Sequence, residues 1–200
     1  MKKKLILLFL ISLLPLKAFA LIEVDITRGN LNPLPLAVSP LSIDDKSKKS
    51  FEKILKKENI GSEISTIVEN NLRTSGLFNP LNKEAFLQAP DIANLKPRFE
   101  DWNLIKAQAL ITGKVTYVDE KLRVEFRLWD ILAAKEMMAL AFTTVPSNWR
   151  RVGHIISDKV YERLTGEKGY FDTRIIYVAE EGPKTQRKKR LAIMDQDGAN

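Results

Sequence analysis

The chain has 200 residues, of which 44% are hydrophobic and 28% charged, and this composition excludes disordered, collagen-like and coiled-coil proteins. The formal net charge is +7, but much of it comes from lysines in the first 20 residues and from a basic run at 184–190. The remaining sequence is slightly acidic, so we expect no nucleic-acid-binding face.

The first 20 residues have the pattern of a secretory signal. Three lysines precede an apolar run from Leu5 to Leu14, and small residues lead to Ala20. We expect cleavage between Ala20 and Leu21. A membrane-anchoring helix is the alternative, but it needs about 20 apolar residues, roughly twice what this run offers. We therefore expect a periplasmic protein with no transmembrane segment after signal cleavage.

The chain contains no cysteine. Disulfides, thiol catalysis, cysteine metal sites and lipid attachment at a cysteine are therefore excluded. An exported domain of this composition must be stabilised by its apolar core.

Residues 22–28 predict a short strand with one apolar face, because apolar and polar side chains alternate along them. Two prolines make the following residues, up to Pro35, a stiff linker. Together we treat 21–35 as a partner-binding strand and linker. The segment Leu36–Val38 predicts a buried strand.

Helical spacing follows in two segments, at 51–55 and 64–72, and Gly76 is placed to end the second helix in the left-handed conformation. Residues 79–100 contain three prolines and predict at most a short helical turn around 85–88.

Three strands are expected next. Residues 110–118 and 122–130 form a hairpin with its turn at 119–121, and a third strand covers 138–145. Pro146 ends that strand, and Ser147 is placed to cap a helix with a buried stripe from Trp149 to Leu164, closed by Gly166.

The resulting fold class is α/β: residues 36–166 form a two-layer N-terminal domain with a mixed sheet and helices on one face. Strands at 174–178 and 191–195 flank the basic loop and do not fit this domain. They suggest that 167–200 hold a linker and the first strands of a second, all-β domain.

The sequence carries little catalytic material. The single histidine, His154, falls within the last helix and is more typical of a packing or surface residue than of a general base. Gly113-Lys114 lacks the other residues of a phosphate loop, and 195–198 resemble a calcium loop whose glycine comes too early, so a polar β-turn is expected there. The basic run has no aromatic residue for base stacking, which favours a solvated loop. We expect no catalytic residue, metal or cofactor.

Three stretches, 29–40, 71–81 and 149–200, resemble the TolB family of the periplasmic Tol-Pal system. The most specific is Ser157 to Val178, which is similar to the junction between the family's two domains. The resemblance implies a non-enzymatic scaffold with an N-terminal α/β domain and a β-propeller, of which 191–200 resemble the start of the first blade. Most of the propeller would be missing, which suggests a truncated or split product.

The resemblance also implies partners. Family members link TolA to Pal, support outer-membrane integrity and constriction during cell division, and are exploited in protein import by colicins; other outer-membrane lipoproteins are further possible partners. Pal binds the propeller, and TolA binds the N-terminal segment. In this sequence the TolA-binding segment is Ile22, Glu23, Val24, Asp25, Ile26, Thr27 and Arg28. The alternative is a periplasmic ligand-binding or hydrolytic α/β domain, which would need a pocket with convergent polar groups.

Overall fold

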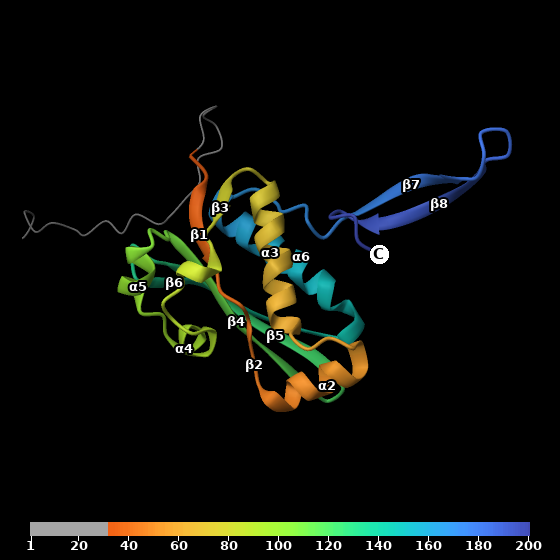
Figure 1. Ribbon diagram of the computed structural model, residues 1–200. Coiled ribbons are helices and arrows are strands. Elements are labelled where there is room, and N and C mark those ends of the chain that lie inside the picture. The colour runs from red at the N-terminus through yellow and green to blue at the C-terminus, as the bar shows by residue number, and fades with distance from the viewer. Residues whose placement is uncertain (1–31) are drawn as a thin grey trace, which may run out of the picture.

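A computed structural model describes residues 32–200 of the chain (Figure 1). The signal, its cleavage site and the segment 22–28 lie outside the described residues. The described part comprises a sheet domain and a separate two-stranded hairpin. Its strands are β1 (Leu34–Val38), β2 (Ser42–Ile43), β3 (Phe78–Pro80), β4 (Ala109–Val118), β5 (Lys121–Asp130), β6 (Lys135–Thr144), β7 (Arg174–Glu181) and β8 (Lys188–Asp195).

The helices alternate with these strands. They are α2 (Asp45–Leu55), α3 (Ile60–Thr74), α4 (Pro90–Leu95), α5 (Phe99–Leu104) and α6 (Trp149–Thr165), with short 3₁₀ turns η1 (Lys83–Ala85) and η2 (Pro146–Asn148). No helix between residues 32 and 200 has both the length and the apolar character needed to cross a membrane.

The sheet is mixed, in the order β3-β1-β4-β5-β6, with β2 as a further partner of β4. The strands β3, β1 and β4 run parallel, and β4, β5 and β6 form the expected antiparallel meander. The β4–β5 turn is two residues long, because Val118 pairs with Lys121. Asp119 and Glu120 both have positive φ angles of 50° and 58°, as a tight hairpin turn requires.

Strand β1 begins at Leu34, so the last two residues of the expected linker are already in the sheet. Pro35 is tolerated there because its carbonyl accepts from Gln108 N–H just before β4 begins. Its missing N–H would point the same way, past the start of β4, where there is no strand to receive it.

One face of the sheet is covered by the long helices α3 and α6, as expected for a two-layer α/β domain (Figure 1). Side chains from alternate positions of β5, namely Leu122, Val124, Phe126 and Leu128, are at most 1% exposed on this face. At Gly153 an added Cβ would lie 2.9 Å from Ile67 Cγ2. The absence of a side chain at this position thus allows α6 to pack closely on α3.

The region 79–100 differs from the expectation. The end of β3, then η1 and α4, lie within it, and α5 begins at Phe99. The two short helices build a second apolar cluster around the 1% exposed Trp102, together with Ala37 and Leu110 from the opposite side of β1 and β4. Trp102 Nε1–H donates to Gln88 Oε1 at 3.0 Å. Part of the second face is therefore covered as well.

The helix ends are mostly as expected. Gly76 and Gly166 have φ angles of 74° and 75° just after α3 and at the end of α6. The cap predicted at Ser147 is wrong, because Pro146–Asn148 form a 3₁₀ turn and Asn148 occupies the N-cap position without a side-chain hydrogen bond to the helix.

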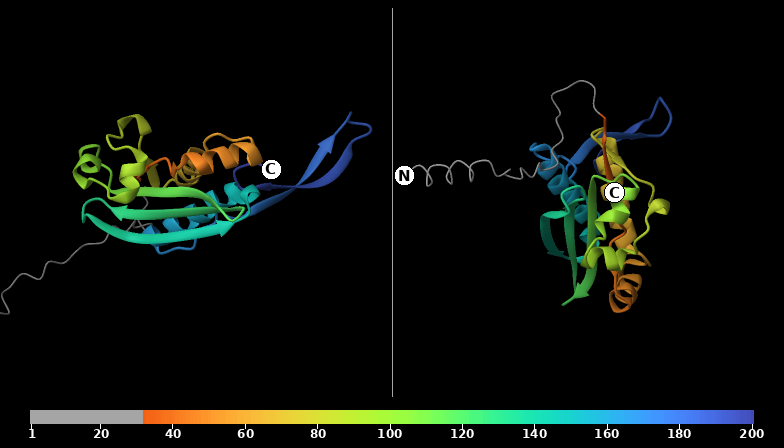
Figure 2. Two further views of the ribbon diagram at one scale, coloured as in Figure 1. Left: turned by 90° about the horizontal axis from the view of Figure 1, so that it is seen from below. Right: turned by 90° about the vertical axis from the view of Figure 1, so that its left-hand side faces the viewer.

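The hairpin β7–β8 extends away from the sheet domain, and the end of the chain returns beside α3 and α6 (Figures 1 and 2). Apolar side chains along it, including Ile176 and Leu191, are 70% and 79% exposed. The hairpin contacts the first domain at its base.

Candidate interaction surface at the base of the hairpin

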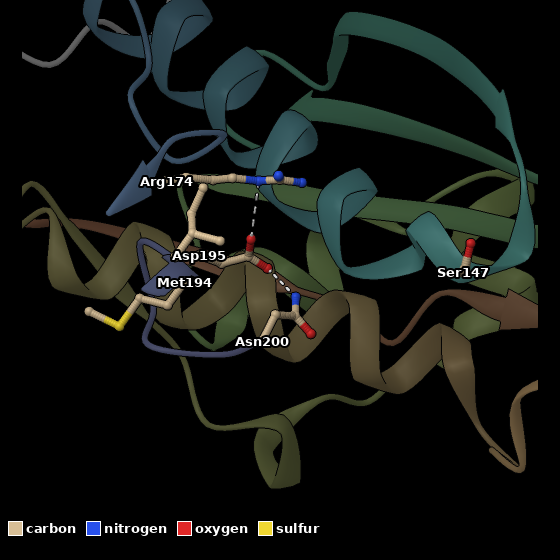
Figure 3. A pocket seen from close by; sticks show the side chains of 6 residues that line it. Ser147, Arg174, Met194, Asp195 and Asn200 are labelled. Atoms are coloured by element: carbon tan, nitrogen blue, oxygen red, sulfur yellow. Dashed lines mark hydrogen bonds and ion pairs between the residues drawn. The ribbon is translucent and has the colours of Figure 1, made fainter. Parts of the chain in front are cut away.

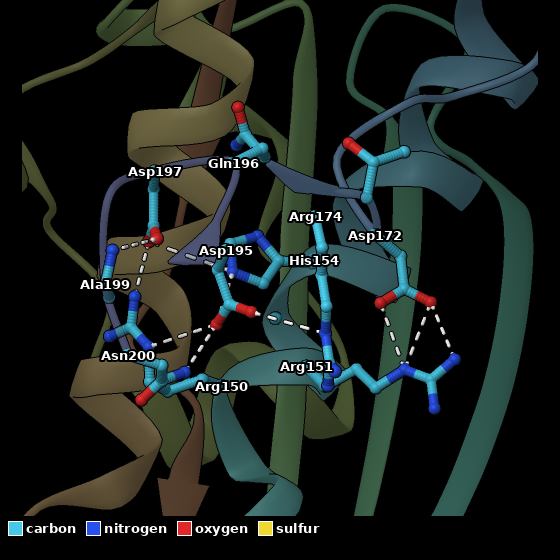
Figure 4. Close-up of polar contacts among 12 residues, drawn as sticks. Arg150, Arg151, His154, Asp172, Arg174, Asp195, Gln196, Asp197, Ala199 and Asn200 are labelled. Carbon is cyan, nitrogen blue, oxygen red and sulfur yellow. Dashed lines mark hydrogen bonds and ion pairs between the residues drawn. The ribbon is translucent and has the colours of Figure 1, made fainter. Parts of the chain in front are cut away.

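The base of the hairpin brings together charged residues from three elements (Figure 4). Arg150 and His154 lie one turn apart on α6, and Arg174 begins β7. Asp195 ends β8 and Asp197 follows in the turn. The turn over 195–198 confirms the expected polar β-turn, closed by Gly198 N–H donating to the Asp195 carbonyl at 2.9 Å.

His154 is a buried residue, only 2% exposed. Asn71 of α3 holds the ring by donating from Nδ2 to Nδ1 at 2.9 Å. Because Nδ1 accepts this hydrogen bond, the neutral ring carries its proton on Nε2. That atom faces the two carboxylates, 3.8 Å from Asp197 Oδ2 and 4.0 Å from Asp195 Oδ2.

The Asn71 amide connects the turn to the helices. It donates a second hydrogen bond to Ser157 Oγ at 2.9 Å, and its Oδ1 accepts from Gln196 Nε2 at 2.8 Å. Gln196 is the residue between the two aspartates. A neutral hydrogen bond thus accompanies the ion pairs.

The carboxylates are paired with arginines. Arg150 Nη2 donates to Asp197 Oδ2, and Arg150 Nε lies 3.8 Å from Asp195 Oδ2. Arg174 Nε lies 3.9 Å from Asp195 Oδ1, and Asn200 Nδ2 donates to Asp195 Oδ2 at 2.6 Å. Opposite charges from the first domain and the turn are therefore matched.

A second set of contacts fixes the segment just before β7. The Asp158 carboxylate of α6 accepts from the Phe171 and Asp172 N–H groups at 2.6 and 3.1 Å. Arg151 donates to both oxygens of Asp172, and these hydrogen bonds, together with the charge of Asp172, raise the pKa of the Arg151 guanidinium. Phe171 is fully buried. We call this set, Asp158, Arg151, Phe171 and Asp172, the root of the hairpin.

Among residues 32–200, one group of three side chains brings its possible metal-ligand atoms within 4.8 Å of one another. It consists of His154, Asp195 and Asp197. Their chemistry favours an ion-paired cluster instead. The guanidinium of Arg150 already lies against both carboxylates, and a metal would need the unprotonated Nε2 lone pair, whereas Asn71 keeps the neutral ring's proton there.

Two hollows adjoin the cluster. One of about 310 Å³ is lined by Ser147, Arg174, Ile193, Met194, Asp195 and Asn200 (Figure 3). The one that His154 lines is about 80 Å³, well below the volume of roughly 300 Å³ at which small-molecule sites begin. The larger hollow reaches that volume, but its one carboxylate, Asp195, is already paired with Arg174 and Asn200. The hollow beside His154 does not favour the hydrolase alternative.

The structure places the other residues that the sequence singled out in structural roles. Trp102, Trp129 and Trp149 pack in the domain. The basic run is partly loop and partly strand, since Lys188–Arg190 belong to β8. The predicted TolA-binding residues 22–28 and the cleavage site at Ala20 and Leu21 lie outside the part of the chain that the structure describes.

Sequence reasoning did not assemble this cluster. Arg150 and His154 are four positions apart on one helix, and Asp195 and Asp197 are two apart in a turn. These complementary spacings are the signal that could have suggested it.

Comparison with known proteins supplies the family. The family model described as the TolB amino-terminal domain matches residues 22–137, which is more than half of the chain. The chain belongs to the TolB family. It is 84% identical over 194 residues to a Tol-Pal system protein TolB from Pelagibacter ubique, covering 97% of this chain and 44% of the relative. This TolB-family chain thus spans less than half the length of that relative.

The fold agrees with this assignment. The crystal structure of TolB from Acinetobacter baumannii matches 90% of this chain and 40% of its own, with a TM-score of 0.68 and 23% sequence identity. The expected α/β fold class is confirmed, and the strands of the hairpin are consistent with a partial propeller.

Proposed function

We propose that this TolB-family chain is a non-enzymatic, periplasmic component of the Tol-Pal system. The observation that supports it most strongly is the 84% identity to a Tol-Pal system protein across nearly the whole chain. The signal pattern of residues 1–20 supports export, and the hollow that His154 lines, about 80 Å³, is smaller than a typical small-molecule site.

In this proposal the segment Ile22–Arg28 adds as a strand to the edge of a TolA sheet, where main-chain hydrogen bonds supply affinity and the apolar face supplies specificity. The segment leads into β1, which pairs on both sides with other strands. A partner bound to this segment would therefore be joined, through the linker, to a strand that has a neighbour on each side.

Pal binding is assigned to the propeller that the TolB resemblance implies, with β7–β8 as its first strands. In this arrangement the protein links TolA to Pal and supports outer-membrane integrity and constriction at division. Colicins and other outer-membrane lipoproteins are further partners of the same system. We keep 36–166 as the first domain and 167–200 as linker and first propeller strands.

Deletion of residues 22–33 tests the proposal. The deletion ends immediately before β1, so binding to purified TolA should be lost while the far-ultraviolet circular dichroism of the domain is unchanged. A matched control replaces only 30–33 with glycine and serine, and it should bind TolA normally. Unchanged TolA binding after the full deletion would refute the assignment.

A further inference from the structure

The two sets of contacts at the base of the hairpin differ in how many of their buried polar groups form hydrogen bonds. At the root, both carboxylate oxygens of Asp158 accept backbone hydrogen bonds, and Phe171 is fully buried. At the turn, Arg150 Nε and His154 Nε2 are buried without a hydrogen-bond partner. The root is therefore the stronger attachment and the turn the weaker one.

We propose that the recess formed by Asn71, Arg150 and His154 is a docking surface for the turn Asp195–Asn200, and that this contact is a releasable latch which sets the angle of the hairpin. This inference does not depend on the proposed function.

The turn is shaped before it docks. Asp195 N–H donates to the Ala199 carbonyl at 2.8 Å, and Asn200 Nδ2 and Ala199 N–H donate to the two aspartate side chains at 2.6 and 3.2 Å. Because these bonds are internal to the turn, both carboxylates are presented together, and little ordering is needed when the turn meets the recess.

The recess selects for charge and for shape. Arg150 reaches Asp197 and Asp195, so two negative charges at this spacing are required. Asn71 accepts from Gln196 between them, which requires a side-chain donor at the middle position. The partner that fits is an acidic turn with an amide between two aspartates.

The latch is also exposed enough to open. The side chains of Arg150 and Asp197 are 24% and 26% exposed to solvent. Water and salt therefore reach this ion pair and weaken it. When the turn leaves the recess, the root still holds Phe171 and Asp172. The hairpin would then pivot about Thr173, between the root and β7, instead of detaching.

Because the given sequence contains no cysteine, two introduced cysteines allow a direct distance measurement on this chain. Spin labels at Glu52→Cys on α2 and Thr185→Cys at the hairpin tip are both on exposed positions. Electron–electron double resonance should give one narrow distance distribution for this labelled protein at low salt. Asp197→Asn, which removes the charge but keeps the shape, should broaden and shift that distribution.

Two variants serve as comparisons. Glu180→Gln breaks surface pairs within the hairpin, with Arg187 and Lys189, and should leave the distribution narrow. Arg150→Asp alone and Asp197→Arg alone should each broaden the distance distribution. The double variant, which exchanges the two charges, should restore at least part of the narrow distribution. Circular dichroism of each variant confirms that the domain is folded.

A narrow distribution that is unchanged in Asp197→Asn would overturn the latch, because the root alone would then fix the hairpin. A broad distribution in the unsubstituted labelled protein would overturn it too, because the turn would not be docked in solution. Broadening by Glu180→Gln to the same extent would show that hairpin charge in general, and not the recess, sets the angle.

Discussion

Replacing Phe171 with alanine should destabilise the protein through the root of the hairpin. The ring is fully buried, with its centroid 5.8 Å from that of Tyr161 and 4.5 Å from that of Tyr170. Truncation of a buried phenylalanine costs about 3–5 kcal/mol, depending on how far the cavity collapses. Tyr170 is 47% exposed and is free to move into the space, so we expect the lower end, about 3 kcal/mol.

Urea unfolding measures this effect. With a slope of about 2 kcal/mol per molar urea, a loss of about 3 kcal/mol lowers the midpoint by roughly 1.5 M. Far-ultraviolet circular dichroism and tryptophan fluorescence should move together, since the indoles lie in the sheet domain. The backbone N–H of residue 171 still donates to Asp158, so the loss reports the side chain alone.

Tyr170→Ala is the matched control, because it removes a neighbouring ring that is half exposed; we expect a loss of under about 1 kcal/mol. A loss of less than about 1 kcal/mol in Phe171→Ala, or equal losses in the two variants, would show that the root does not belong to the core of the first domain.

Three further predictions concern other parts of the chain. Burial alone would raise the pKa of Glu69, but hydrogen bonds from Lys83 and Arg73 outweigh it and lower the pKa below its ordinary value of 4.5. The ionised form therefore stabilises the fold above pH 4.5, and this contribution is lost as the pH falls further. Glu69→Gln should flatten this part of the acid-unfolding profile. Gly153→Ala should lower the free energy of unfolding by about 1–3 kcal/mol in urea titrations, because the new methyl would overlap Ile67; a neutral result would mean that α6 shifts freely on α3. Trypsin should cut first within 184–190, where every residue is exposed, and earlier cleavage within α3 or α6 in time-resolved mass spectra would contradict the domain boundary near Gly166.

The parts of the fold with long, regular patterns were predictable from the sequence. Strict alternation from Leu122 to Leu128 indicated a strand with one buried face, and the structure buries all four of these apolar side chains. The two glycines after α3 and α6 were predictable because many helices end near a left-handed residue, and glycine adopts that conformation without strain.

The region from β3 to α5 was not predictable in the same way. Helices α4 and α5 have six residues each, too short to show a helical period. They are held by tertiary contacts, above all the hydrogen bond from Trp102 to Gln88. Local sequence does not reveal a partner 14 residues away.

The docking of the turn was missed for a related reason. His154 was correctly placed in the last helix, and of the two expected settings, packing or surface, the structure shows packing. Its neighbours come from Asn71, 83 positions earlier in the chain, and from a turn beyond the hairpin. Periodicity describes which face of a helix is buried. It does not say which distant polar group will meet that face.

The order of the strands bears on when the protein folds. Strand β1 comes first in the described chain, yet both of its neighbours in the sheet arrive late: β3 follows α2 and α3, and β4 follows α4 and α5. Pairing of β1 with β3 requires about a third of the first domain, whereas pairing with β4 must wait until more than half of it is available, and such non-local closure is slow. For the export that residues 1–20 are proposed to direct, the delay is useful, because an early, local core would resist translocation.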